Sequence, residues 1–285
     1  MNKALLDLNA DLHSHSTVSD GWHVPAEVVA RAAHNGVELL ALTDHDCVGG
    51  IDAAMEAARE HGLSFVAGVE ISVSLFEQTV HIVGLGIDHR NQKLLDGLGK
   101  VREGRGERAE RIAAALEAAG VPDALAGARR FVGNPELVSR AHFARHIVAA
   151  GLMPNVSTVF QHYLAEGKPG YVSHEWASLE DAVGWIRAAG GVAVIAHPAR
   201  YRFSAHQFDH FFERFIAAGG EAIEVVSGAH TDAEIREYAD IARRLGLLAS
   251  RGSDFHGENE SRVDLGRCEP MPLGLDPVWM RLILI

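Results

Sequence analysis

Residues 39–70 read LLALTDHDCVGGIDAAMEAAREHGLSFVAGVE, an apolar run, an alanine-rich segment and a second apolar run. The two runs, 39–43 and 64–69, have the length and composition of buried strands. The alanine-rich segment between them predicts a helix that ends at Gly62. His45 and Glu70 lie at or just beyond the carboxyl ends of the two strands. The stretch therefore predicts a strand–helix–strand unit of an α/β fold with a largely parallel sheet.

The same alternation extends along both flanks of this stretch. Further strands are predicted at 8–13, 71–76, 80–87, 192–196, 222–226 and 248–250, the second and third of them paired with each other. Further helices are predicted at 25–35, 179–189, 206–218 and 232–245. About seven strands separated by helices favour a closed or nearly closed βα barrel. An open doubly wound sheet is the alternative.

The middle of the chain differs from both flanks. From Gln92 to Gly170 the pattern is helical, without a run of strand character, and charges are dense between Lys100 and Arg111. We therefore expect a barrel formed by residues 1–91 and 171–285. Residues 92–170 are expected to form a helical insertion that covers the active site.

Charge and composition narrow the class of protein. The formal net charge is −12, whereas extended binding to a nucleic-acid backbone normally needs a basic surface. A phosphate-containing substrate is still possible, because bound divalent cations would make the local electrostatic potential positive. No apolar run approaches the roughly 18 residues that cross a bilayer, so no membrane association is expected.

The cysteines and the N-terminus predict a cytoplasmic protein. Met1–Ala10 lacks the apolar stretch of a secretory signal. The only cysteines, Cys47 and Cys268, lie far apart and do not resemble a disulfide framework. No feature indicates an obligate protein partner.

Histidine is unusually frequent, with 17 residues, and this suggests metal ligation. In His13-Ser14-His15 the spacing turns both imidazoles to one side of an extended backbone. Asp254 and His256 repeat that geometry around Phe255. In a βα barrel the carboxyl ends of the strands are where active sites form. The candidate ligands at such positions are His13, His15, His45, Glu70, His197, Asp254 and His256. Asp20, shortly after the first strand, and His81, within the strand predicted at 80–87, are candidates as well.

Simpler interpretations remain for each motif. An isolated His-x-His can be a surface pair, and Asp254 with His256 can form a salt bridge at a strand end. Asp44 or Asp46 could orient His45 rather than bind metal. His142, His146 and His162, in the expected insertion, suit packing or substrate contact.

The motifs, taken together and in order, resemble the PHP (polymerase and histidinol phosphatase) family. They are Asp11-Leu12-His13-Ser14-His15, Thr43-Asp44-His45-Asp46, Gly68-Val69-Glu70, His81, Ala196-His197-Pro198 and Gly252-Ser253-Asp254-Phe255-His256. The resemblance implies a distorted seven-stranded βα barrel with two or three divalent cations. It implies three ligand groups: His13, His15, Glu70 and Asp254; Glu70, His81 and His197; Asp20, His45 and His256.

Within the family, residues 167–172 and 197–201 resemble one branch in particular. That branch removes the 3′-phosphate from nucleoside 3′,5′-bisphosphates and includes 5′-to-3′ exonucleases acting on short RNA. The resemblance implies a metal-dependent hydrolase in which a metal-bound hydroxide attacks phosphorus. Ligation by nitrogen and oxygen without thiolate favours Mn²⁺, with Zn²⁺, Fe²⁺ and Mg²⁺ as alternatives.

Residue roles follow from this expectation. The catalytic centre is expected to contain His256, Asp254, His197 and Arg200, with His256 or a metal-bound water as the acid. The substrate is expected to contact Lys168, Tyr171, Arg140, Arg145 and Arg200. It would be a small nucleotide, or short RNA at most.

Three other functions stay open. The first is a phosphatase for histidinol phosphate or another small phosphomonoester, and the second is a nuclease that acts mainly on RNA. The third is a non-catalytic metal-binding accessory module, although every expected ligand position is filled.

Overall fold

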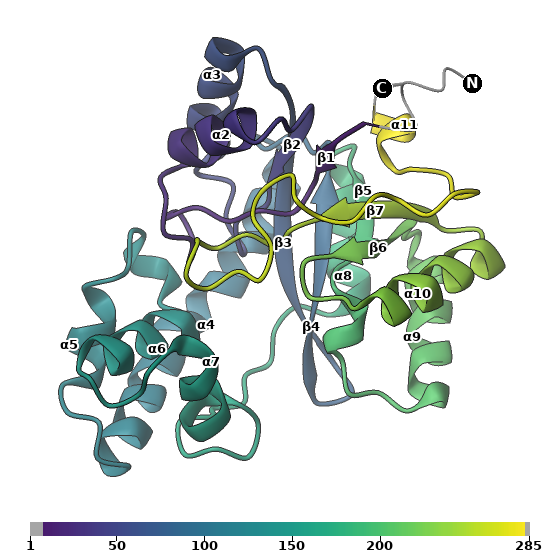
Figure 1. Ribbon diagram of the computed structural model, residues 1–285. Helices are drawn as coiled ribbons and strands as arrows, with labels where there is room; N and C mark the ends of the chain where they lie inside the picture. Colours follow the sequence, from purple (N-terminus) through teal and green to yellow (C-terminus); the bar gives the residue numbers. More distant parts are fainter. Residues whose placement is uncertain (1–7, 283–285) are drawn as a thin grey trace.

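The computed structural model describes residues 8–282, in which seven strands form one sheet whose spatial order follows the chain (Figure 1). Of the N-terminal segment considered above, residues 1–7 lie outside this range. The strands are β1 (Ala10–Asp11), β2 (Leu39–Leu42), β3 (Ser64–Leu75), β4 (Gln78–Leu85), β5 (Val192–Ile195), β6 (Ala222–Ser227) and β7 (Leu248–Gly252). The ends of the sheet meet where the Leu12 amide donates to the Arg251 carbonyl at 2.9 Å. The predicted α/β barrel of seven strands, nearly closed, is confirmed.

One strand runs against the others. β4 is antiparallel to both β3 and β5, and every other neighbouring pair is parallel. The predicted pairing of 71–76 with 80–87 is confirmed, with Ile71 opposite Ile82. The two strands predicted at 64–69 and 71–76 are one continuous strand, because Glu70 lies within the ladder rather than in a loop.

The outer helices lie where the sequence places them, to within one residue at each end. They are α2 (Pro25–His34), α3 (Ile51–His61), α8 (Leu179–Ala188), α9 (Ala205–Ala218) and α10 (Asp232–Leu245). A short helix that was not predicted, α11 (Trp279–Leu282), follows β7. Gly62 ends α3 in a left-handed conformation that suits glycine (φ 64°). Ser204 and Thr231 cap α9 and α10 with side-chain hydrogen bonds to the first turn.

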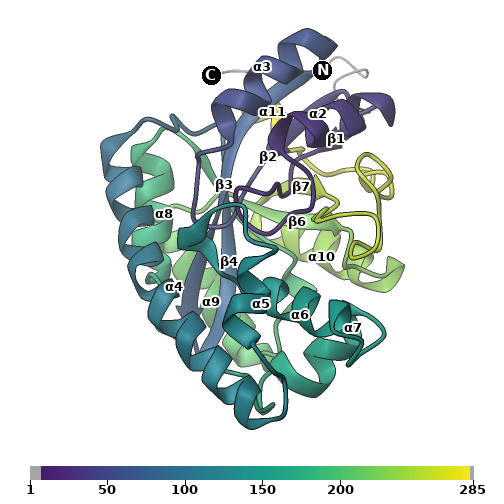
Figure 2. The same cartoon turned by 90° about the vertical axis from the view of Figure 1, so that its left-hand side faces the viewer.

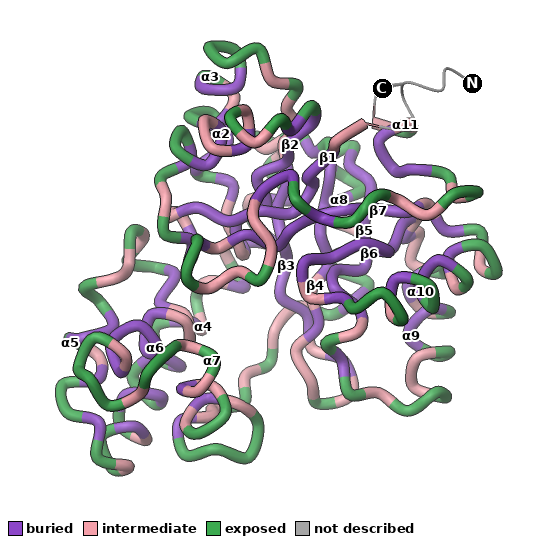
Figure 3. Tube along the Cα trace, viewed as in Figure 1, coloured by how far each residue is buried: buried purple, intermediate pink, exposed green. Residues whose placement is uncertain are grey.

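Alternation along the strands divides the core into two layers. In β2, Leu39 and Ala41 face an inner cluster, whereas Leu40 and Leu42 pack in the cluster that contains the outer helices. The strands are buried almost throughout, and exposed positions concentrate on the helices and loops (Figure 3). No helix among residues 8–282 is long and apolar enough to cross a membrane.

The middle segment is helical and contains no strand. Its elements are α4 (Gln92–Ala118), α5 (Ala124–Arg129), η1 (Pro135–Leu137), α6 (Arg140–Ala149), α7 (Val156–Val159) and η2 (Phe160–Leu164). Figure 2 shows α5, α6 and α7 grouped together beside the long α4. These helices have a hydrophobic cluster of their own, whereas Leu94 and Leu98 at the start of α4 pack in the barrel core. Helix α4 therefore connects the two units.

Candidate active site

A cavity of about 470 Å³ lies between the carboxyl ends of the barrel strands and the helical segment. The barrel wall supplies histidines and carboxylates, among them Glu70, His81 and His256. The opposite wall, formed by α4, α6 and α7–η2, supplies Arg105, Arg108 and other side chains. The volume falls in the range of sites for small molecules, about 300–1,000 Å³.

Glu70 occupies the centre of the barrel wall and is fully buried. One of its oxygens, Oε2, lies 3.3 Å from His13 Nε2, 3.2 Å from His15 Nε2 and 3.0 Å from His45 Nδ1. The other, Oε1, lies 2.9 Å from His81 Nδ1 and 3.0 Å from His197 Nε2. Glu70 therefore faces two groups of histidines, one with each oxygen.

The first group contains His13, His15, Glu70 and Asp254, as the resemblance implies. Asp254 Oδ1 lies 3.5 Å from His13 Nε2 and 3.2 Å from His15 Nε2. The two histidines follow β1 and Asp254 follows β7, so closure of the barrel brings them together. Their ligand atoms, with that of Glu70, all lie within 4.8 Å of one another.

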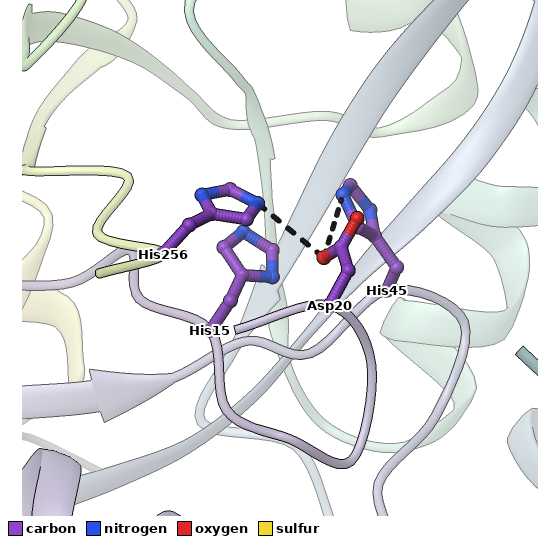
Figure 4. A group of neighbouring side chains, drawn as sticks. All are labelled: His15, Asp20, His45 and His256. Carbon is purple, nitrogen blue, oxygen red and sulfur yellow. Dashed lines mark ion pairs between the residues drawn. The ribbon is translucent and has the colours of Figure 1, made fainter. Parts of the chain in front are cut away.

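A second group gathers around Asp20 (Figure 4). Asp20 Oδ1 is 3.4 Å from His256 Nε2 and 3.8 Å from His45 Nε2. The expected trio of Asp20, His45 and His256 is therefore brought together, and His15 joins it. His15 thus belongs to two groups, which the sequence does not indicate.

The third expected group gathers around Glu70 Oε1. His81 Nδ1 and His197 Nε2 lie 3.3 Å apart, each within 3.0 Å of that oxygen. His45, Glu70 and His81 also have ligand atoms within 4.8 Å of one another. His45 thus stands between two of the expected groups.

Buried acceptors fix which nitrogen of each imidazole faces the cluster. His13 Nδ1 donates to Glu224 Oε1 at 2.6 Å, and His256 Nδ1 donates to the Asp254 carbonyl at 2.9 Å. When either ring is neutral, its lone pair is therefore on Nε2, which points at the neighbouring carboxylates. This arrangement is typical of metal-binding histidines, whose other ring nitrogen is held by an acceptor.

Glu224 is a functional residue that the sequence analysis missed. It is buried in β6, where its Oε2 also accepts from the His197 amide at 2.5 Å. The available signal was a single carboxylate within the apolar run Ala222–Val226. A charged residue in a buried strand needs a partner, and here the partners are two of the candidate ligands.

Three residues of the site adopt left-handed backbone conformations. Asp46, His197 and Asp254 have φ values of 49°, 27° and 55°. Such values are uncommon outside glycine and concentrate at functional sites. Each of the three lies just beyond a strand; His197 and Asp254 line the cavity, whereas Asp46 is buried against Ser72 and Arg105.

The electrostatics keep the carboxylates ionised. Burial acts to raise the pKa of Glu70, but His45, His81 and His13 hold that pKa well below its usual value. Burial likewise opposes ionisation of Asp254, and Arg200 and His13 hold its pKa well below the ordinary range. Arg200 Nη1 lies 2.7 Å from Asp254 Oδ2.

Several of these buried atoms lack a hydrogen bond to any described residue. They include His13 Nε2, His15 Nε2, Asp20 Oδ1, His45 Nδ1 and Glu70 Oε2. Buried polar atoms are normally paired, so five convergent buried atoms without a hydrogen-bond partner indicate that a ligand is missing, and a cation can bind them once the imidazoles are neutral. The nitrogen and oxygen donor set fits divalent cations such as Mn²⁺ or Zn²⁺.

The two acidic neighbours of His45 have other roles. Asp44 accepts hydrogen bonds from Ser16 and Ser19. Asp46 accepts from Ser72 and is ion-paired with Arg105. Neither carboxylate is therefore seen to orient the His45 ring.

The residues expected to contact substrate separate into two sets. Arg140 and Arg200 line the cavity. Lys168 and Tyr171 do not, and Arg145 is buried in an ion pair with Glu260, Nε to Oε1 at 2.7 Å. Arg105, Arg108 and Trp176 line the cavity as well, although no sequence motif pointed to them. The available signal was the spacing of Arg105 and Arg108, which places both on one face of α4.

Comparison with known proteins yields close relatives. A family model described as the PHP domain matches residues 11–128. A 3′,5′-nucleoside bisphosphate phosphatase from Chromobacterium violaceum is 53% identical over 274 residues, covering 96% of each chain. The 5′-3′ exoribonuclease Rnm from Escherichia coli K12 is 41% identical, covering 94% of this chain and 92% of its own.

Solved structures agree over the same length. An amidohydrolase from Chromobacterium violaceum, with bound sulfate and no metal, has a TM-score of 0.94 and 52% identity, covering 97% of this chain and 96% of its own. A protein from Bifidobacterium adolescentis assigned as a metal-dependent phosphoesterase has a TM-score of 0.82 and 29% identity, covering 96% and 95%. The likeness therefore includes the helical segment as well as the barrel.

Proposed function

The chain belongs to the PHP domain family, and we propose that it is a metal-dependent phosphoesterase that removes the 3′-phosphate from nucleoside 3′,5′-bisphosphates. The observation that carries the proposal is the placement of Glu70. Its two oxygens face two groups of histidine nitrogens, on the wall of a cavity large enough for a nucleotide. The relative that is 53% identical over nearly the whole chain is itself a phosphatase of this kind.

We propose that two or three divalent cations bind here, Mn²⁺ being the most suitable. One would be held by His13, His15, Glu70 and Asp254, a second by Glu70, His81 and His197, and a third by Asp20, His45 and His256. When bound, such cations lower the pKa of water and neutralise charge on phosphoryl oxygens.

The chain's own groups would orient the phosphate. Arg200, with a half-exposed side chain beside Asp254, can donate to phosphoryl oxygens at the edge of the ligand cluster. Glu224 would keep His13 in the tautomer that binds metal through Nε2. Hydrolysis breaks the bond between phosphorus and the 3′ oxygen, and water supplies the hydroxyl to phosphorus and the proton to the leaving oxygen.

His256 suits the role of ligand better than that of acid. Its Nδ1 proton is donated to the Asp254 carbonyl, so in the neutral ring Nε2 carries the lone pair and is available as a ligand atom. We therefore assign it to the cluster and leave the proton for the leaving oxygen to solvent.

We propose that residues 92–170 select the substrate, over a barrel formed by residues 1–91 and 171–285. The two walls of the cavity support this division, since the arginines of α4 and α6 face the ligand cluster of the barrel. Cys47 and Cys268 are both free thiols, which is compatible with a reducing, cytoplasmic setting.

A second activity, 5′-to-3′ removal of nucleotides from short RNA, is favoured by one observation. The Rnm exoribonuclease matches over 94% of this chain. The net charge of −12 restricts such an activity to short oligomers.

A substrate panel tests the proposal. Mn²⁺-loaded protein would be assayed for product release from adenosine 3′,5′-bisphosphate, histidinol phosphate, a dinucleotide and a long RNA. The bisphosphate should give the highest kcat/KM. A higher kcat/KM for histidinol phosphate, or for long RNA, would refute the proposal and identify that compound as the substrate. No activity on any of the four would favour the accessory-module interpretation.

A further inference from the structure

We propose that Ser139, which caps helix α6 in the helical segment, is a positioning residue for Asp20 and for the cation that Asp20 would hold. The inference rests on the proposed function above, because it takes Asp20, His45 and His256 as the ligands of one cation. It goes further in making that cation, unlike the others, depend on how residues 92–170 pack against the barrel.

The two carboxylate oxygens of Asp20 have different surroundings. Oδ1 is buried without a hydrogen-bond partner among the described residues, 3.4 Å from His256 Nε2 and 3.8 Å from His45 Nε2. Oδ2 accepts a hydrogen bond from Ser139 Oγ at 3.1 Å. Because a carboxylate is planar, a bond that fixes Oδ2 also fixes the direction of Oδ1. Ser139 therefore turns one oxygen of Asp20 toward the two histidines.

Ser139 is itself held in place by the first turn of α6. Its amide donates to His142 Nδ1 at 3.0 Å, and its Oγ accepts from the Ala141 amide at 3.1 Å. These two bonds form a capping box at the start of the helix. A hydroxyl has a single proton, and with its acceptor side facing α6 that proton is directed at Asp20.

The backbone of Asp20 is attached to the same helix. Arg145, further along α6, donates from Nη2 to the Asp20 carbonyl. Its guanidinium also pairs with Glu260, Nε to Oε1 at 2.7 Å, and lies 4.5 Å from the centre of the Trp22 ring. Helix α6 thus holds Asp20 by its main chain as well as by its side chain.

The other candidate ligands are held by the barrel. Within residues 8–282, Asp20 is the only one of them with a hydrogen bond to the helical segment. His13 and His197, for example, are held by Glu224 of β6. A shift of α6 would therefore displace Asp20 and leave the other ligands in place.

A second serine cap shows that the contact with Asp20 is more than capping. Ser178, at the start of α8, accepts from the Asp181 amide and donates to Asp181 Oδ2 at 2.7 Å, so both its partners lie in its own helix. Ser139 instead donates to a carboxylate 119 residues away in the sequence. The proton of Ser139 is thus used between the two units of the fold.

The test measures Mn²⁺ binding to metal-free protein by equilibrium dialysis with metal analysis. Asp20→Ala identifies the class of site to which Asp20 contributes. Ser139→Ala should weaken Mn²⁺ affinity at that class by about tenfold or more, with the remaining affinities unchanged. Ser139→Gly should repeat the loss, because glycine is tolerated at a helix cap. Ser139→Thr, which keeps the hydroxyl, should restore binding.

Ser178→Ala is the matched control, because it removes an equivalent cap without touching a ligand. It should leave Mn²⁺ binding as in the wild type. Wild-type binding in Ser139→Ala and Ser139→Gly, or an equal loss at every class of site, would overturn the proposal. So would equal Mn²⁺ binding in the wild type and Asp20→Ala, since Asp20 would then hold no cation.

The outcome is independent of catalysis, because binding is measured without substrate. If the Mn²⁺-loaded wild type hydrolyses none of the phosphate esters, the proposed function fails. Selective loss of one class of Mn²⁺ site in Ser139→Ala, restored in Ser139→Thr, would still establish Ser139 as the residue that positions Asp20.

Discussion

Glu70, His13 and His15 illustrate how single residues carry this site. Period-two spacing on an extended chain explains why both imidazoles point one way, and this could be read from the sequence. The buried acceptor of His13 could not be read in the same way, because Glu224 lies more than two hundred residues away on β6. Contacts between distant strands depend on barrel closure, which no local pattern encodes.

Glu224→Gln tests that contact. One amide oxygen cannot accept both from His13 Nδ1 and from the His197 amide as well as a carboxylate does. Affinity for Mn²⁺ should fall about 10–100-fold, measured by calorimetric titration. The exposed Glu213→Gln serves as control. Unchanged affinity in Glu224→Gln would exclude an orienting role for this carboxylate.

Metal binding should release protons. Burial acts to lower the pKa of His15, but hydrogen bonds to Asp254 and Glu70 outweigh it and raise the pKa to about 10 in the metal-free protein. The ring is therefore protonated at pH 7 and must lose its proton to bind a cation. Mn²⁺ affinity should rise with pH between about 7 and 10.

Calorimetry in two buffers of different ionisation enthalpy at pH 7 measures the protons released. The expected result is net release of protons to buffer on Mn²⁺ binding. Equal heats in the two buffers would mean that His15 does not exchange its proton for metal.

At the scale of elements, the sequence predicted the bounds of the outer helices well. It did not predict how α4 joins the barrel to the helical segment. Caps such as Ser204 and Thr231 and the glycine after α3 act locally, so their effects are visible in the sequence. Helix α4 packs first in the barrel core and then in the helical cluster. Its charged surface conceals this change, because Arg105 and Arg108 are buried against the cavity rather than exposed.

Arg145 on α6 joins the helical segment to two loops of the site. It contacts Glu260 through two nitrogens at 2.7 and 2.8 Å and donates to the Asp20 carbonyl at 2.5 Å. Arg145→Met would leave Glu260 buried and unpaired, and the free energy of unfolding should fall by about 3–5 kcal/mol. Urea denaturation measures the change.

Arg214→Met is the matched control for this prediction. Arg214 also contacts a carboxylate through two nitrogens, but the pair with Glu180 is partly exposed. Its loss should cost only about 0–1 kcal/mol. Similar losses in the two variants would show that Arg145 has no special role in joining the units.

At the scale of the whole molecule, barrel geometry explains why the ligand positions could be anticipated. Parallel strands direct their carboxyl ends to one rim, so polar residues after successive strands converge there. Apart from Arg140, the side chains of the facing wall could not be anticipated, because they belong to an insertion whose orientation depends on α4. This is why the sequence placed the metal ligands together, yet pointed to Lys168 and Tyr171 instead of Arg108.

The central claim is that the cluster around Glu70 hydrolyses a phosphomonoester. Release of inorganic phosphate from adenosine 3′,5′-bisphosphate tests it, in Mn²⁺-loaded wild-type protein and in His13→Ala. His34→Ala, on the exposed side of α2, is the control, and circular dichroism verifies that each variant is folded. The wild type and the control should release phosphate, and His13→Ala should be slower by about 10³-fold. Phosphate release that is unaffected in His13→Ala, or absent in the wild type, would contradict the account.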